Sequence, residues 1–553
     1  IIIGAGPAGC ILAKELSESG RNTVLLIEAG ENNDNDVLIM DSAANPSMHV
    51  AKYTWLGQSV PQTNTNYQSY PWTTGRLSGG GSSINGQQYV RPTNNVLKQW
   101  AMISGPLWGP TAANNNFYMI ENHIELENNR EENDTHRSSN KRLDIREMPV
   151  TVPEMTMKFV AAIEQGTGYE KINNYNDRNT PIGPFYKWHL TQRPNGNRES
   201  ASTAYLSPDV VNSLGYGVGE RKLIIYYKTT VLKIIFNTNN DAIGVEFLRE
   251  GNIGFAHGRK RIIISAGINS AKILLLSGIG PFDYLTRLNI PVVFNNPYVG
   301  HNLVDHTINT AVFTVNASDI HEVLMEPNAL YTGGAFLPAP NAVDKSQRSI
   351  QLIGNYSNGA LIVLIVSLDP KSRGSVVLQN NDPLKPVLAD YNMLDNPEDL
   401  ELIKSVYKDY IAEIADSFFS IDPSYQLINP SLEIIHDENL LEEYIKDNIS
   451  VTYHQQSSLR MAPYSIGGVV DNMGRVYGVN NLIVADASIT PSTIDGNTQA
   501  ASYLIGYTIA QQLLSGEQYH IESQYYHKNY YKHHNSHDKY KRPFCNYDKN
   551  PKH

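Results

Sequence analysis

Three glycines near the start of the chain have the spacing of a phosphate-binding loop. Residues 1–10 read IIIGAGPAGC, so Gly4, Gly6 and Gly9 directly follow three β-branched residues. The pyrophosphate of a dinucleotide sits at a helix N-terminus only where the backbone can approach it closely. Gly4 would allow the tight turn, Gly6 would leave room for the phosphates, and Gly9 would let the helix pack against the strand. The pattern predicts a dinucleotide site.

The neighbouring residues supply the elements that would position this loop. Residues 1–3 form the end of a strand, 8–17 have apolar residues at helical spacing, and 24–27 form a second buried strand. Together they predict a βαβ unit. Glu28 ends the second strand, about 20 residues after the glycines, where an acid accepts hydrogen bonds from the ribose of the dinucleotide. This motif does not distinguish FAD from NAD.

A second stretch, residues 75–92, is also dense in glycine and serine and reads GRLSGGGSSINGQQYVRP. Small residues let backbone N–H groups approach a flavin and its phosphates. On these residues the sequence resembles the glucose–methanol–choline (GMC) oxidoreductases, which are FAD-dependent alcohol oxidases and dehydrogenases. The resemblance runs from Ile1 to about Gln512 and includes the segments 265–281, 300–306 and 453–498.

The chain departs from the family pattern at several positions. Ser78 replaces an aliphatic residue, Ala271 replaces a proline, and Ala266-Gly267 inverts the usual order. After His454, Ser457 stands where the family has glycine, and Ser458 stands where it has threonine. Because Ser457 adds a Cβ atom, it narrows the allowed backbone conformations next to a candidate catalytic residue.

The resemblance implies a catalytic pair near the C-terminus, His454 and Asn497. The family's histidine faces the reactive N5 atom of the flavin, and a neutral imidazole suits the removal of the hydroxyl proton. Asn497 does not titrate, so its amide would orient the substrate oxygen. His306, in the segment Gly300–His306, is expected to be structural rather than catalytic.

The cofactor implied by the resemblance is FAD. Its predicted contacts are Gly4, Gly6, Gly9, Glu28, Gly80, Asn85, Val231, Asp486, Asn497 and Thr498. The family counterpart of Val231 meets the adenine through its backbone. Asp486 would repel phosphates unless backbone N–H groups or a proton engage its carboxylate. Ile84 stands where relatives with covalently attached flavin have histidine, so we expect FAD to be bound non-covalently.

Composition excludes several other classes. The 553 residues carry a net charge of -11, from 44 basic and 55 acidic residues, which argues against nucleic acid as a partner. The two cysteines, Cys10 and Cys545, form neither a disulfide framework nor a zinc pattern, and we expect no metal. The apolar run 360–366 is too short to span a membrane and predicts a buried strand.

The expected fold class is α/β, or α+β overall. We expect a discontinuous Rossmann-like FAD-binding domain formed by residues 1–45, 75–100, 205–300 and 455–516. A second, discontinuous substrate-binding domain, formed by residues 46–74, 101–204 and 301–454, would be built on an antiparallel sheet with helices. Residues 517–553 are rich in His, Tyr, Lys and Asn and predict a disordered tail, in which His527, His533, His534 and His537 are solvated rather than metal-bound.

The favoured function is oxidation of an alcohol, such as an aromatic primary alcohol, to the aldehyde, with O2 as oxidant and hydrogen peroxide as product. A dehydrogenase that uses a quinone-type acceptor and an FAD-containing hydroxynitrile lyase are the alternative enzymes. The asparagine-rich composition and the tail also resemble GMC-type proteins of giant DNA viruses, which are found on virion fibres. A virion surface protein that retains the fold is therefore the non-enzyme alternative.

The chain starts with Ile inside its first motif, so we expect a segment upstream of it. Location therefore stays open between a secreted and a virion protein, because no targeting signal is visible. The oligomeric state also stays open.

Overall fold

The computed structural model describes residues 1–43, 50–124, 141–178, 182–325 and 327–515. The chain divides into two compact units, Ile1–Ala510 and Gln511–His553. Every described sheet lies in the first unit. Of the second unit only residues 511–515 are described, at the end of helix α14 (Gln499–Leu514). The predicted tail and its four histidines lie outside the described residues.

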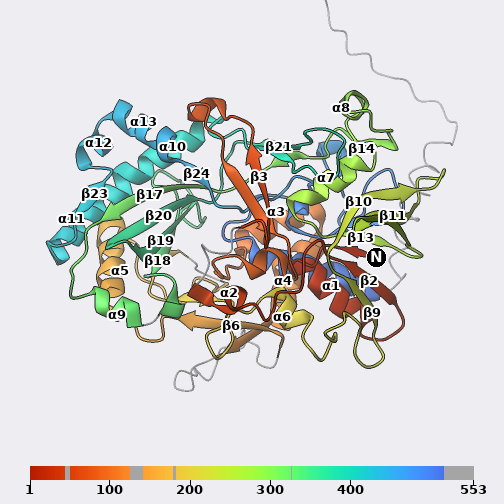
Figure 1. Ribbon diagram of the computed structural model, residues 1–553. Coiled ribbons are helices and arrows are strands. Elements are labelled where there is room, and N and C mark those ends of the chain that lie inside the picture. The colour runs from red at the N-terminus through yellow and green to blue at the C-terminus, as the bar shows by residue number, and fades with distance from the viewer. Residues whose placement is uncertain (44–49, 125–140, 179–181, 326, 516–553) are drawn as a thin grey trace, which may run out of the picture. The chain divides into compact units, whose positions relative to one another are not determined.

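A five-stranded parallel sheet carries the first glycine loop. Its strand order is β25-β13-β1-β2-β9, with bounds Leu482–Val484, Ile262–Ile264, Ile2–Ile3, Thr23–Ile27 and Lys222–Tyr226. Helix α1 (Pro7–Ser17) connects β1 to β2 and contacts both strands, as Figure 1 shows. The strands are short and rich in β-branched residues because both faces of the sheet are covered. The predicted βαβ unit is confirmed.

Residues 221–264, in which apolar and polar residues alternate, form five strands. β9 and β13 belong to the parallel sheet, whereas β10 (Thr229–Phe236), β11 (Ala242–Arg249) and β12 (Asn252–His257) form an antiparallel sheet. Lys228 and Glu250 take positive φ angles of 52° and 51° in the connecting turns. Glu250 is followed by Gly251, whose φ is 78° and whose residue type signals a turn, whereas no such residue marks the turn at Lys228.

The largest sheet has seven strands in the order β23-β17-β20-β19-β18-β7, and β24 also pairs with β17. Their bounds are Leu427–Asn429, Thr307–Phe313, Ala360–Ser367, Ile350–Ser357, Gly334–Leu337, Gly183–Phe185 and, for β24, Ser450–Val451. All of its pairings are antiparallel. The predicted buried strand at 360–366 is β20.

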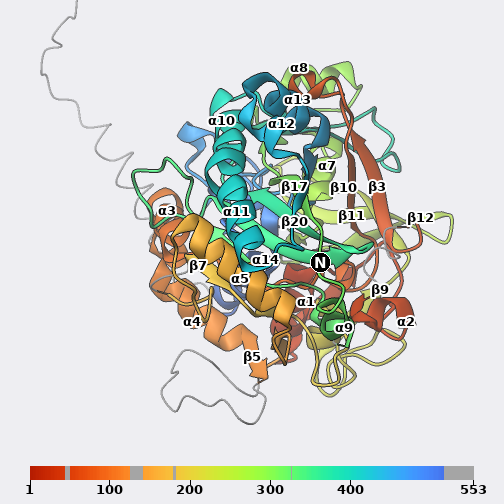
Figure 2. The same ribbon diagram turned by 90° about the vertical axis from the view of Figure 1, so that its left-hand side faces the viewer.

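Helices α5 (Glu154–Thr167) and α11 (Ala412–Ile421) cover one face of this sheet, as Figures 1 and 2 show. Phe418 of α11 lies 5.6 Å from Phe313 of β17 and 6.1 Å from Phe159 of α5, between ring centroids. Because side chains alternate along a strand, the residues next to Phe313 point to the opposite face. That opposite face is the one that borders the candidate active site.

The other strands form smaller sheets. A mixed sheet has the order β16-β21-β22-β3-β4, a second has β5-β6-β8, and β14 pairs with β15. Their bounds, in chain order, are β3 (Thr54–Ser59), β4 (Pro71–Gly75), β5 (Glu121–Ile124), β6 (Leu143–Met148), β8 (Trp188–Leu190), β14 (Ile279–Gly280), β15 (Phe294–Asn295), β16 (His301–Leu303), β21 (Gly374–Val377) and β22 (Leu388–Asp390).

The remaining helices are α2 (Val37–Met40), α3 (Asn94–Ser104), α4 (Pro110–Ile120), α6 (Ala201–Tyr205), α7 (Ile268–Leu276), α8 (Phe282–Arg287), α9 (Ile320–Met325), α10 (Pro397–Val406), α12 (Leu432–His436) and α13 (Glu438–Asn448). A π-helical turn at Tyr407–Ile411 separates α10 from α11.

The sheets follow the segments of the two predicted domains. Every strand of the parallel sheet falls in a predicted FAD-binding segment, and every strand of the seven-stranded sheet falls in a predicted substrate-binding segment. Residues 1–510 nevertheless form one compact unit. The division into two domains stays a prediction, whereas the mixed α/β fold is confirmed.

Candidate active site

The first glycine loop turns tightly between β1 and α1. A Cβ atom on Gly9 would lie 1.9 Å from the carbonyl oxygen of Gly4, so helix and strand pack too closely there for any side chain. Gly4 has a φ of 95° and its own Cβ would lie 2.5 Å from the oxygen of Ser265. Both glycines therefore serve the turn and the packing, as the spacing predicted.

The second glycine-rich segment lies directly against the first. The N–H of Gly79 donates to the carbonyl of Ala5 at 2.8 Å, and a Cβ on Gly80 would lie 2.7 Å from the Cα of Gly6. Gly80–Ser83 forms a single 3-10 turn. The two glycine-rich segments, about 75 residues apart in the sequence, thus lie side by side and form one backbone surface. The hydroxyl of Ser78, which replaces the family's aliphatic residue, bonds to that of Ser202 at 2.7 Å.

The carboxylate of Glu28 holds the loop from the end of β2. It accepts hydrogen bonds from the N–H groups of Ala5 at 2.8 Å and Gly30 at 2.9 Å. Burial raises the pKa of Glu28 to about 6, against the lowering effect of these donors. Glu28 therefore fixes the loop as well as lining the space beside it.

A cavity of about 500 Å³ extends from this loop to the C-terminal pair. Ten of the eleven predicted site residues line it: Gly4, Gly6, Glu28, Gly80, Asn85, Val231, His454, Asp486, Asn497 and Thr498. Gly9 does not, because it is packed beneath the loop. The volume lies in the range of cofactor and small-molecule sites. Predicted site residues that lie up to more than 490 positions apart in the sequence therefore line one cavity.

Two positions in the cavity wall need glycine because a side chain there would fill the cavity. A Cβ on Gly6 would find no protein atom nearer than 3.9 Å, and one on Gly81 would find none within 4 Å. Neither has a positive φ angle, so the backbone does not require glycine there. Side chains at these positions would enter the cavity beside the N-terminus of α1, where a pyrophosphate binds well. The cavity therefore fits FAD.

Asp486 is engaged by donors, as its position near phosphates requires. Its carboxylate accepts hydrogen bonds from the N–H groups of Gly267 at 3.0 Å and Ser488 at 2.8 Å, and from the hydroxyl of Ser270. Gly267 has φ 59° and ψ -130°, a conformation that side chains disfavour. The inverted Ala266-Gly267 pair thus places glycine where the start of α7 needs it.

Asn85 is held by an arginine that carried no predicted role. Arg198 Nη1 donates to the side-chain oxygen of Asn85 at 2.9 Å and to its backbone carbonyl at 2.7 Å. Burial lowers the pKa of Arg198 to about 10, so it keeps its charge at neutral pH. Arg198 thereby fixes the second glycine-rich segment.

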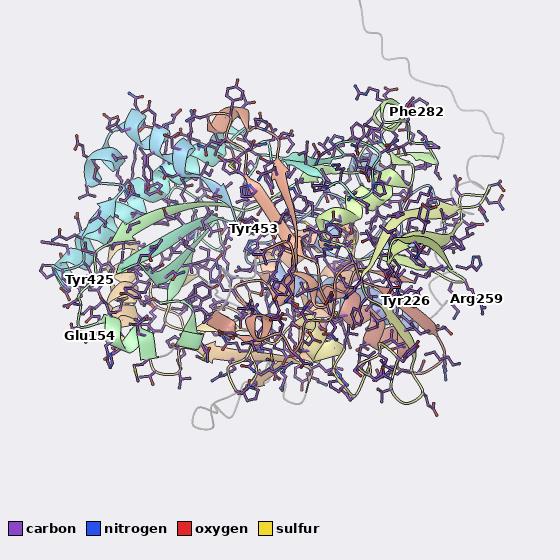
Figure 3. The ribbon with its side chains drawn as sticks, viewed as in Figure 1. Glu154, Tyr226, Arg259, Phe282, Tyr425 and Tyr453 are labelled. Atoms are coloured by element: carbon purple, nitrogen blue, oxygen red, sulfur yellow. The ribbon has the colours of Figure 1, made fainter. Side chains whose placement is uncertain are left out.

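His454 lies at the other end of the cavity, between two side chains. Its Nδ1 atom is 3.0 Å from Nδ1 of His306, and its Nε2 atom is 3.3 Å from Nδ2 of Asn497. Its backbone N–H donates to Asp305 at 2.8 Å. Figure 3 labels Tyr453, the residue before it, which lines the same cavity as residues of β3 and β20.

The hydrogen bonds determine which nitrogen of His454 carries the proton. His306 Nε2 lies 2.8 Å from the carbonyl oxygen of Ile494, which only accepts, so Nε2 of His306 is the protonated nitrogen. The contact of that nitrogen with Gln456 is longer, at 3.4 Å. His306 Nδ1 is then an acceptor, and His454 Nδ1 must donate to it. The lone pair of His454 lies on Nε2, on the side of Asn497.

The same chain of hydrogen bonds determines how the amide group of Asn497 is oriented. Because Nε2 of His454 accepts, the amide nitrogen of Asn497 faces it, and the amide oxygen faces away. That oxygen accepts from Nε2 of Gln351 at 3.1 Å. Gln351 lines the cavity from β19 and was missed, although a glutamine inside the apolar strand run SIQLIG is the signal that could have identified it.

Burial governs the charges of this cluster. Burial, and next the proximity of His306, hold the pKa of His454 well below its usual value. Burial also lowers the pKa of His306 to about 4 and raises that of Asp305 to about 7. Both imidazoles are therefore neutral at pH 7, which the assignment of protons requires.

The backbone is strained on both sides of His454. Tyr453 has a φ of 62° and Ser457 a φ of 64°, both in the left-handed region that a side chain disfavours. Ser457 is the position where the family has glycine, so the expected conflict is present. Its hydroxyl bonds to Thr490 at 2.7 Å and offsets part of the cost. Such strain concentrates at functional sites.

Other predictions can be placed briefly. Cys10 is a buried free thiol, whereas Cys545 lies outside the described residues. His306 does not line the main cavity and contacts it only through His454. In the described ranges no group of three or more His, Cys, Asp or Glu side chains could hold a metal ion. No helix of the described part is long and apolar enough to cross a membrane.

Comparisons with known proteins agree with the cavity. Models of the GMC oxidoreductases match residues 1–308 and 370–506. The chain is 28% identical to an oxygen-dependent choline dehydrogenase of Rhizobium meliloti (strain 1021), over 93% of this chain and 95% of that protein. It is 26% identical to an alcohol dehydrogenase [acceptor] of Pseudomonas putida, over 92% and 94%.

Among solved structures, pyridoxine 4-oxidase from Mesorbium loti superposes with a TM-score of 0.82 at 24% identity, over 94% of this chain and 99% of that one. This likeness shows the fold. A viral origin and a location on virions stay predictions.

Proposed function

The chain belongs to the GMC oxidoreductase family, and we propose that it oxidises an alcohol to the aldehyde with His454 as the base and O2 as the final electron acceptor. Family membership confirms the predicted class, an FAD-dependent oxidoreductase that acts on alcohols. The individual site residues, the oxidant and the nature of the alcohol belong to the proposal.

The lone pair on Nε2 of His454 is the observation that carries it. Alcohol oxidation requires a group that takes the hydroxyl proton, and a neutral imidazole whose lone pair borders a cavity meets that requirement. His306 keeps that nitrogen unprotonated because its own Nδ1 accepts the other proton of His454. Asn497 Nδ2 lies 3.3 Å from this nitrogen. A bound alcohol would take the place of this contact, with its O–H donating to Nε2 and its oxygen accepting from Asn497 Nδ2.

FAD would be held at the other end by the loop residues Gly4, Gly6 and Gly80, by Glu28 and by Asp486. The chemistry that it supplies when bound is acceptance of a hydride from the carbon that carries the hydroxyl group. We propose non-covalent binding, since Ile84 lines the cavity with an aliphatic side chain that forms no bond to a flavin.

Anaerobic mixing with a panel of primary alcohols tests the proposal. Loss of flavin absorbance with at least one alcohol, followed by peroxide release under air, is the expected result. Reduction without peroxide would favour a dehydrogenase, which the name of the Pseudomonas putida relative also suggests. Bound FAD that no alcohol reduces would contradict the proposal and favour a lyase or a virion surface protein.

A further inference from the structure

The face of the seven-stranded sheet that borders the cavity has a nearly uniform chemistry. Its lining side chains, here called the sheet wall, are Ile308 of β17, Leu364 and Val366 of β20, and Gln351 and Ile353 of β19. Val366 pairs with both Gln351 and Ile308, and Leu364 pairs with Ile353. The five side chains thus form two adjacent rows in which Gln351 is the single polar group.

Gln351 contributes a buried hydrogen-bond acceptor to this wall. Its Nε2 donates to Asn497, which leaves Oε1 as a buried acceptor without a partner. The assignment of the two amide atoms is not arbitrary, because the carbonyl of Ile494 fixes the direction of every bond from His306 onward. The side chain is fully buried, and it carries no charge.

The ionisable groups of the cavity belong to other walls. Apart from Tyr331 and Tyr453, the ionisable residues that line the cavity are Glu28, Lys272, Asp486 and His454. Glu28 and Asp486 bind backbone N–H groups of the dinucleotide end, and Lys272 on α7 is a cation. Asp305 lies behind His454 and borders a separate, much smaller cavity. Among the described residues, no carboxylate that lines the cavity therefore belongs to the sheet wall.

Aromatic rings do not replace the missing carboxylate. A quaternary ammonium group is recognised by several ring faces together. Of the lining rings, Tyr331 is the one that packs against the hydrophobic cluster on the same face as the sheet wall, 5.5 Å from Trp188, and its hydroxyl is bound to the carbonyl of Gly86. Tyr453 is 37% exposed, so it is not part of a closed cage.

We propose that the substrate is an uncharged alcohol whose body lies against the sheet wall, and that Gln351 determines this specificity. The inference rests on the proposed function, since it takes the alcohol to react at His454. A cation placed against the wall would lose its hydration and find no partner for its charge. The chain would thus differ in substrate from the choline dehydrogenases to which it is similar.

Choline and 3,3-dimethylbutan-1-ol form the matched pair for a test, because they have the same shape and differ in one charge. Each is titrated into the oxidised FAD-loaded protein, and binding is followed by the flavin spectrum. We expect the neutral alcohol to bind at least tenfold more tightly. Equal or tighter binding of choline, or no binding of the neutral alcohol, would overturn the inference.

A Gln351→Glu variant adds a carboxylate to the sheet wall, and Gln351→Met is the neutral control of similar length. We expect Gln351→Glu to shift the ratio of the two dissociation constants toward choline by at least tenfold and Gln351→Met to leave it within threefold. An unchanged ratio in the first variant would contradict the role of Gln351. The ratio cancels any loss that the altered contact with Asn497 causes for both ligands.

Binding separates this inference from the proposed function. If the neutral alcohol binds but neither it nor any alcohol of the panel reduces the flavin, the proposed function fails while the specificity stands. If a choline-like cation both binds and reduces the flavin best, the proposed function stands while the specificity fails.

Discussion

Replacement of Asn497 by aspartate should raise the pH at which His454 stops acting as a base, without removing a side chain. The carboxylate would lie about as far from Nε2 of His454 as the amide nitrogen does, which is 3.3 Å. Two unit charges at that distance attract by about 5 kcal/mol at an effective dielectric constant near 20. This upper bound corresponds to roughly 3.5 pKa units, and solvent in the cavity would reduce it to about 2.

The native pKa of His454 is held well below its usual value by burial and by His306. The imidazole is therefore neutral down to acidic pH, and flavin reduction should be constant there until the pH falls through that pKa. In Asn497→Asp the same loss of rate should occur at a pH higher by about 2 units or more. At any pH on this acidic limb, a larger share of the molecules would then carry a protonated His454 than in the native protein.

Asn497→Ala is the matched control, because it removes the orienting donor and adds no charge. Both variants should reduce the flavin more slowly than the native protein in anaerobic stopped-flow experiments with the best alcohol of the panel. The acidic limb of the pH profile should move in Asn497→Asp and stay in place in Asn497→Ala. Identical limbs in the two variants would refute the assignment of the lone pair to Nε2.

Three further predictions concern stability and cofactor content. Burial raises the pKa of Asp305 from 3.8 to about 7, so the native protein loses stability as the pH rises from about 4 through 7, because a buried carboxyl must ionise. Asp305→Asn should therefore stabilise the protein at pH 8 by roughly 4 kcal/mol and have little effect at pH 4, as measured by urea denaturation. Ser457→Gly should be more stable than Ser457→Ala by about 1 kcal/mol, since both lose the bond to Thr490 but only glycine relieves the positive φ; equal urea midpoints would show no strain. Gly81→Leu places a side chain in the cavity, so this variant should keep the native circular dichroism spectrum and lose most of its FAD. The control Ile84→Val should keep both the spectrum and the FAD. Full FAD content in Gly81→Leu would show that no cofactor approaches Gly81.

Much of the fold follows from local patterns. The strand, glycine loop, helix and second strand at the N-terminus are encoded within 28 residues, because close packing leaves so few residue types possible there. The turn at Lys228 was not evident, since a positive φ angle at lysine is imposed by strand pairing rather than by local preference.

The candidate site likewise contains residues that the sequence identifies and residues that it does not. The glycines and Glu28 are recognisable from spacing, and His454 and Asn497 from the resemblance. The roles of His306, Gln351 and Arg198 depend on contacts between segments that are 113 or more residues apart, such as that between Arg198 and Asn85. Spacing rules do not reach such pairs, and Gln351 was visible only as a polar residue in an apolar strand.

The central claim, that Nε2 of His454 removes the hydroxyl proton, is tested most directly by the single-turnover rate of flavin reduction in His454→Ala. With FAD content equal to that of the native protein and a saturating alcohol, the rate constant should fall by about 10² to 10⁴. A rate constant within threefold of the native value would contradict the claim.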